Sequence, residues 1–173
     1  MKLFTPDLFA RAQSADPAVQ AEAEHRWEEA NDRYEEHLRR IEPELPEHVR
    51  SFNDLPLHDA QVDSIARQGD RLVLVLRQDL PPHDLVVLTY TLAGEPFIDK
   101  EALPAAIRSA GMAFLYDELE VVREGQGKHF LQSILFSNGW EVRLPFRDVE
   151  VTAAETIYPP APARPRSLSS TQA

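Results

Sequence analysis

The stretch "HFLQSILFSNGWEVRLPFRDVEV", residues 129–151, has the pattern of two strands joined by a tight turn. Asn138-Gly139 is the strongest local signal in the chain, because both residues tolerate positive φ and favour a type I′ hairpin turn. Apolar and polar side chains then alternate over residues 140–146, as in a strand with one buried face. The alternation continues one residue out of step afterwards, which predicts a bulge near Arg147-Asp148.

Other β-rich runs precede this hairpin at residues 70–78, 83–92 and 113–124. β-branched and aromatic residues bounded by turn residues are typical of strands. Between the second and third runs, residues 101–110 predict a short helix that starts near a proline. We therefore predict a mostly antiparallel sheet of six or seven strands over about residues 57–153, which can curl towards a barrel.

The N-terminal part has a helical period instead. Apolar residues recur every three or four positions over residues 19–41, after Asp16-Pro17, a capping residue followed by a first-turn proline. This predicts an amphipathic helix over about 17–42, with a short helix before it at 6–13 and one or two turns after it at 46–53. Its polar face carries acid–base pairs four residues apart, which indicate either a solvated face or a docking surface for a basic partner.

The predicted fold class is α+β, with the long N-terminal helix packed on one face of the curled sheet. Residues 1–56 form the helical segment and residues 57–156 the sheet region, which together make one domain, a size that suits a chain of 173 residues. Residues 157–173 are rich in proline and serine, and we expect them to form a flexible tail.

Composition limits the function. The chain has no cysteine, which excludes disulfides, thiolate metal sites and cysteine nucleophiles. A formal net charge of -11 opposes binding to phosphate backbones and anionic bilayers, so we expect no nucleic-acid and no membrane partner. With no secretory leader and no long apolar run, we expect a soluble protein of the bacterial cytoplasm. The sequence leaves the oligomeric state open.

Motifs for cofactor chemistry are missing. The sequence contains no phosphate-binding glycine loop, no dinucleotide fingerprint and no nucleophile elbow. One Glu-x-x-His spacing, Glu22 to His25, is too little for a metal site without ligands from other helices. We therefore expect no cofactor and no bound metal.

The candidate catalytic residues are His58 and Asp59, in "DLPLHDAQV" at residues 54–62. If a strand begins near residue 58, His58 points to the core and Asp59 to water. In a structural interpretation, the imidazole bonds a backbone carbonyl or a carboxylate, and Asp59 bonds turn amides. In a catalytic interpretation, His58 is a general base that an acid from elsewhere holds in place.

That acid is Asp117, in "LYDELEV". On a regular strand it lies on the inner face, where a lone carboxylate is costly unless it is paired, and His58 is the partner we predict. A bulge that shifts the strand by one residue would bring Glu118 inward instead. The third interpretation is a small-ligand pocket in the curled sheet, near Tyr116 and Trp140.

Four pieces of sequence, "MKLFTP" at 1–6, "LHDA" at 57–60, "YDELE" at 116–120 and "LFSNGWE" at 135–141, together resemble an uncharacterised family of small acidic bacterial proteins. The resemblance extends to about residue 152. Because the function of that family is unknown, the resemblance implies no catalytic residues. In its size, its acidic composition and its short "HDA" motif, the chain is also similar to acidic immunity proteins that neutralise toxins.

The sequence therefore favours a non-enzymatic binding or protein-interaction module, with a basic protein as its partner. This prediction follows from the lack of reaction motifs together with the acidic composition. The alternatives are a hydrolase that uses His58 with Asp117, and a small-ligand-binding protein.

Overall fold

The computed structural model of the protein describes residues 1–78, 85–98, 111–125 and 127–154. The helices are α1 (Pro6–Ala12), α2 (Pro17–Ile41) and α3 (Glu47–Asn53), and a 3-10 turn, Glu42–Glu44, separates the last two. The strands are β1 (Gln61–Gln68), β2 (Arg71–Arg77), β3 (Leu85–Leu92), β4 (Phe97–Ile98), β5 (Phe114–Glu124), β6 (Gly127–Phe136) and β7 (Glu141–Ala154). These elements confirm the α+β class.

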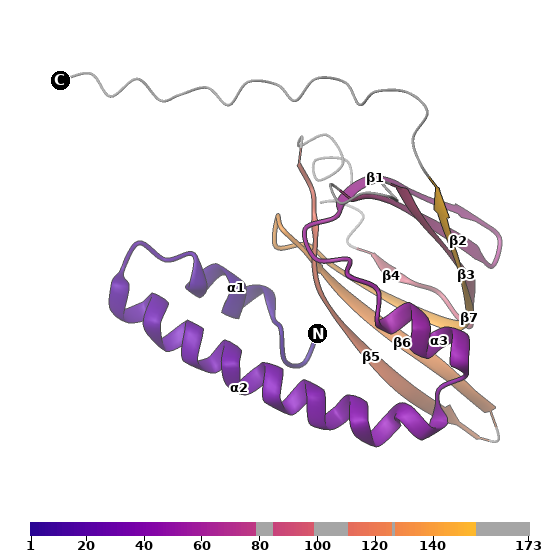
Figure 1. Ribbon diagram of the computed structural model, residues 1–173, viewed down its shortest axis with the longest axis horizontal. Coiled ribbons are helices and arrows are strands. Elements are labelled where there is room, and N and C mark those ends of the chain that lie inside the picture. The colour runs from indigo at the N-terminus through magenta and orange to yellow at the C-terminus, as the bar shows by residue number, and fades with distance from the viewer. Residues whose placement is uncertain (79–84, 99–110, 126, 155–173) are drawn as a thin grey trace.

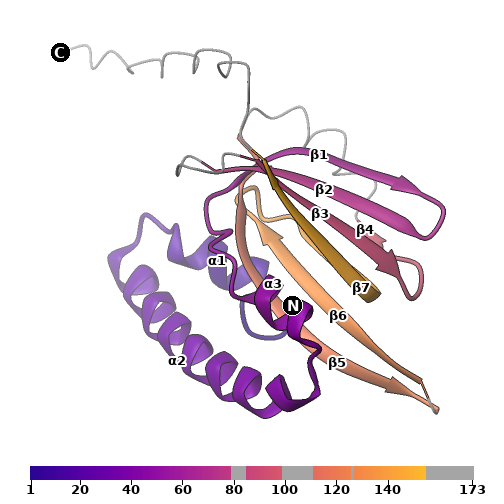
Figure 2. The ribbon, with the colours of Figure 1, turned by 45° about the vertical axis from the view of Figure 1, so that its right-hand side comes forward.

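The strands form one antiparallel sheet in the order β1-β2-β3-β7-β6-β5, with the short β4 beside β7. The sheet curls until its two outer strands meet at a single bridge, Gln61 with Ala113, and beyond it they diverge (Figure 1). The sheet is therefore curled, as predicted, but is not closed into a barrel. Helix α3 packs against the inner face of this curl, beside β7 (Figures 1 and 2).

The inner face of the curl holds the main core. Alternate residues of β2 and β3 are buried, as the two-residue period of a strand requires. Val49 and Phe52 of α3 are buried against them, and the Phe52 ring meets Tyr90 edge-to-face with centroids 6.1 Å apart. Each fully buried side chain of this size contributes about 1.5–3 kcal/mol, so these contacts hold α3 on the sheet.

Helices α1 and α2 lie side by side along β5, on the other side of that strand from the core (Figure 2). Ala23 and Ala30 of α2 are buried, and their small side chains let the helix pack closely against its neighbours. The Phe4 ring stacks on Tyr116 of β5, with centroids 5.2 Å apart, and also packs on Trp27 of α2. The long helix packed on one face of the sheet is thereby confirmed.

Helix α2 begins where its caps predict. The Asp16 carboxylate accepts a hydrogen bond from the Ala18 amide at 2.9 Å, and Pro17 takes the first helical position. Its predicted acid–base pairs do not form ion pairs with each other. Glu22 pairs with Arg11 of α1 instead, at 2.9 Å, so its charge joins the two helices. The four pairs predicted from spacing were Glu22–Arg26, Glu29–Arg33, Glu35–Arg39 and Glu36–Arg40.

The β6–β7 hairpin is present, but its turn is not type I′. Gly139 has a φ of 78°, whereas Asn138 is not in the left-handed region. The Asn138 side chain accepts the Trp140 amide at 3.0 Å, and the Phe136 amide donates to the Trp140 carbonyl at 2.9 Å. This is a three-residue loop that ends on a left-handed glycine. The type I′ prediction is therefore wrong, because the Asn138 side chain supplies the turn contact.

The predicted bulge in β7 is confirmed. On β3, Thr91 lies opposite Asp148 and the next residue, Leu92, lies opposite Phe146, so Arg147 is the extra residue. Two other predictions, the helix at 101–110 and the tail at 157–173, lie outside the described residues. None of the described helices is long and apolar enough to cross a membrane.

Candidate functional site

His58 and Asp59 lie in the loop before β1, which begins only at Gln61. Asp59 has a φ of 64°, in the left-handed region, and this breaks the strand alternation that the sequence suggested. The prediction that His58 points to the core is therefore wrong, since its side chain is 54% exposed. Its Nδ1–H donates to the Leu115 carbonyl at 2.8 Å, the kind of bond that the structural interpretation predicts.

Asp117 lies on the inner face and is bonded to Gln132, not to His58. The Gln132 amide donates to the Asp117 carboxylate at 2.9 Å, and the Tyr90 hydroxyl donates to the Gln132 carbonyl at 2.6 Å. Burial raises the pKa of Asp117 to about 6, with a smaller opposing effect of the Gln132 bond and a further rise from the Glu118 charge. His58 and Asp117 share no hydrogen bond or ion pair among the described contacts, so the structure does not bring this predicted pair together.

Glu118 is buried, at 3% exposed, but on the opposite side of β5 from Asp117. Its carboxylate accepts the backbone N–H groups of Lys2, Leu3 and Phe4 at 2.8–2.9 Å. A bulge does occur at the start of β5, but it does not turn Glu118 into the core. The N-terminal segment covers Glu118 instead, and charge-assisted hydrogen bonds of this kind are among the stronger ones in proteins.

The free edge of β5 is covered by side chains from α2 and from the loop before β1. The Leu119 amide donates to the Tyr34 hydroxyl at 2.8 Å, and His37 Nε2–H donates to the Leu119 carbonyl at 2.9 Å. His58 does the same at Leu115. Unpaired edge groups invite another strand, so these contacts protect the sheet from association at β5.

A pocket of about 520 Å³ lies beside His58, between α1, α2 and the start of β5. Rings of Trp27 and Tyr116 line it, with centroids 4.6 Å apart. We call it the aromatic pocket, and its lining residues are Phe9, Ala12, Gln13, Glu24, Trp27, Glu28, His58, Asp59, Leu115 and Tyr116. Tyr116 thus belongs to a hollow of the size that binds small ligands.

Trp140, the other residue predicted to bind a ligand, does not line this pocket. It is 4% exposed, and its ring packs on Phe136 with centroids 5.5 Å apart. The two predicted ligand residues are therefore separate in the structure. In the part of the chain that the structure describes, no group of three or more His, Asp or Glu side chains could hold a metal ion.

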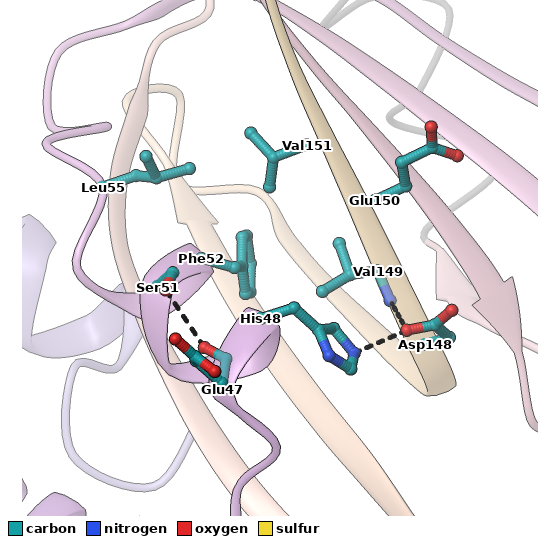
Figure 3. Close-up of a pocket in the computed structure, with 9 residues that line it drawn as sticks. All are labelled: Glu47, His48, Ser51, Phe52, Leu55, Asp148, Val149, Glu150 and Val151. Carbon is teal, nitrogen blue, oxygen red and sulfur yellow. Dashed lines mark hydrogen bonds and ion pairs between the residues drawn. The ribbon is translucent and has the colours of Figure 1, made fainter.

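A larger hollow, of about 840 Å³, lies between α3 and the last part of β7 (Figure 3). We call it the α3–β7 groove, and it is lined by Glu47, His48, Ser51, Phe52, Leu55, Asp148, Val149, Glu150 and Val151. At one end, His48 Nε2 lies 2.7 Å from the Asp148 carboxylate and so links the helix to the strand (Figure 3). Both of these side chains are more than half exposed, so this pair contributes little stability.

One edge of β7 faces this groove without a neighbour among the described strands. Pairing between β6 and β7 ends at Phe130 with Phe146, whereas pairing between β3 and β7 continues to Ala154. Residues 147–154 therefore have a strand on one side only within the described chain. The extra residue Arg147 turns β7 away from β6 at this point. The sequence signal for the groove was the shift by one residue in the apolar–polar alternation along β7 at this bulge. That shift by itself does not show that one edge of β7 loses its neighbouring strand.

Comparison with known proteins gives a family but no activity. Residues 15–149 match the model of the family described as "Protein of unknown function (DUF4085)". This match spans α2, α3 and nearly all of the sheet. No curated protein matches the chain at a significant level.

Proposed function

This chain belongs to that family of unknown function, and we propose that it is a binding module that receives an extended, basic segment of a partner protein in the α3–β7 groove. The observation that carries the proposal is the edge of β7 at residues 147–154, which among the described strands pairs only with β3. An extended peptide can add to such an edge through main-chain hydrogen bonds, a common mode of peptide recognition.

The chemistry of the groove supports a basic, partly apolar peptide. Its floor is apolar, with Phe52 and Val149 buried and Val151 36% exposed. Among the described residues, its lining has three carboxylates and no lysine or arginine. Alternate side chains of a bound strand point in opposite directions, so one set would meet the apolar floor and the other the carboxylates.

Two of those carboxylates already have partners. Asp148 pairs with His48, and Glu150 lies 3.8 Å from Arg71 in an exposed pair. Glu47 is exposed at the start of α3 and makes no ion pair among the described residues. The groove therefore keeps a negative charge for a cationic side chain to neutralise, and binding should weaken as salt rises.

The test uses the full chain and a blocked heptapeptide of alternating lysine and valine, measured by isothermal titration calorimetry. We expect saturable binding that weakens with salt. A control peptide of the same sequence, N-methylated at every second residue along one edge, keeps the charge but cannot pair with β7. It should bind at least about tenfold more weakly, a loss of about 1.4 kcal/mol.

Variants locate the site. The double change Glu47→Gln with Glu150→Gln should weaken binding roughly threefold to tenfold, the range expected for two exposed ion pairs. The matched control Asp32→Asn with Glu35→Gln removes the same charge from the exposed face of α2 and should leave binding unchanged. Equal binding of the N-methylated peptide, or equal effects of the two double variants, would overturn the proposal.

Two other occupants of the groove give distinct results. If a second copy of the chain pairs along β7, sedimentation will show a dimer that the heptapeptide dissociates. If the chain's own residues 155–173 occupy the groove, changing Arg164 and Arg166 to glutamine will tighten peptide binding. Either result would replace the partner protein as the natural occupant.

A further inference from the structure

We propose that the aromatic pocket is a second binding site, which takes a guanidinium group such as that of a peptide-borne arginine. Its walls come from α1, α2, the loop before β1 and the start of β5, and none of its lining residues also lines the α3–β7 groove. The two proposals are therefore independent, and either can fail without the other.

The charges of the pocket favour a cationic ligand. Glu24 and Glu28 lie four residues apart on one face of α2, and Asp59 faces the same hollow from the loop before β1. The described part of the lining contains no lysine or arginine. Glu24 accepts one hydrogen bond, from the Gln20 amide at 3.0 Å, which leaves most of the capacity of its carboxylate unused.

The orientation of His58 adds an acceptor. Its Nδ1–H donates to the Leu115 carbonyl. In the neutral ring, Nε2 therefore carries a lone pair and can accept a hydrogen bond. Nε2 lies 3.9 Å from the Asp59 carboxylate, too far for a hydrogen bond. Four acceptors thus share one hollow. Arginine, which has five donors and no acceptor, matches such a set better than any other side chain.

The aromatic walls favour a planar cation. The Trp27 and Tyr116 rings meet at 61° with centroids 4.6 Å apart, and both line the pocket. A guanidinium group stacks on such faces, a contact worth about 0.5–2 kcal/mol depending on how well water is excluded. This separates guanidinium from ammonium, which is more strongly hydrated and cannot stack as a plane.

The charge of the free amino acid indicates where the arginine comes from. Free arginine carries a carboxylate that the three acids of the pocket would repel. We therefore expect the ligand to be arginine within a peptide, not the free amino acid.

The test follows the indole N–H resonance of Trp27 by NMR in the full chain. The chain has two tryptophans, so Trp140→Phe assigns the two signals. Titration with N-acetyl-arginine N-methylamide should move the Trp27 signal in a saturable way. The citrulline analogue has the same shape but no charge, and it should bind at least about tenfold more weakly. The lysine analogue should bind at least about threefold more weakly than the arginine derivative.

Single variants complete the test. Glu28→Gln and Asp59→Asn should each weaken arginine binding about threefold or more. Asparagine tolerates the left-handed backbone at position 59, so the second variant keeps the loop. Asp32→Asn is the matched control, because Asp32 is exposed on the same helix outside the pocket, and it should change nothing.

Some results would overturn the proposal. Equal binding of the citrulline analogue would show that charge plays no part. Equal losses in Asp32→Asn and Glu28→Gln would show that cations respond only to the net charge of the protein. Tighter binding of free arginine than of the blocked derivative would overturn the peptide-borne source.

Discussion

Replacing Asp117 by asparagine should raise the stability of the variant relative to the wild type as the pH rises from acid to neutral. Burial raises the pKa of Asp117 from 3.8 to about 6, so the folded state holds the proton more tightly than the unfolded chain does. Below pH 3.8 the carboxyl is protonated in both states and costs nothing. Between 3.8 and about 6 the cost of the buried charge grows, and above that it is constant.

The size of the effect follows from the shift. A shift of about 2 pKa units corresponds to about 3 kcal/mol, of which about 1.4 kcal/mol develops between pH 5 and pH 7.5. The asparagine keeps an oxygen for the Gln132 amide, but its own N–H₂ group lacks an acceptor among the described contacts. That loss can reach about 1–3 kcal/mol, but it is independent of pH. The informative quantity is therefore the change of the variant-minus-wild-type difference with pH.

The assay is urea denaturation at pH 5, 6 and 7.5, followed by circular dichroism and by the fluorescence of the two tryptophans. The variant should gain about 1.4 kcal/mol on the wild type between the first and last pH, or roughly 3–6 °C in melting temperature. Asp32→Asn, which changes an exposed acid, should give a difference that is the same at each pH. A difference for Asp117→Asn that is flat with pH would refute the buried-charge reasoning.

Three further changes test other contacts. Tyr90→Phe keeps the ring but leaves the Gln132 carbonyl without its donor, and it should lower the unfolding free energy by about 1–3 kcal/mol in the same urea assay. Glu118→Gln weakens the acceptor of three backbone N–H groups at residues 2–4, so hydrogen exchange there should become faster while exchange in β2 stays unchanged. Tyr34→Phe uncovers the Leu119 amide at the β5 edge, whose exchange should rise, and unchanged exchange would show that the helix itself excludes water.

Local sequence determined the parts of this protein that depend on neighbours in the chain. The start of α2 follows from Asp16-Pro17, because a cap and a first-turn proline act within one helical turn. The strands β2 and β3 follow from runs rich in β-branched residues, and the bulge at Arg147 from a slip in the alternation along β7. Such signals need no knowledge of what lies across the sheet.

Contacts between distant residues decided the candidate sites. Asp117 meets Gln132 because β5 and β6 pair in one register, and Glu118 meets residues 2–4 from the far end of the chain. The α3–β7 groove exists because β7 outlasts its pairing with β6, which no pattern within β7 shows. A strand pattern gives the side chains of each face but not the partner of each edge, and both proposed sites depend on that second kind of information.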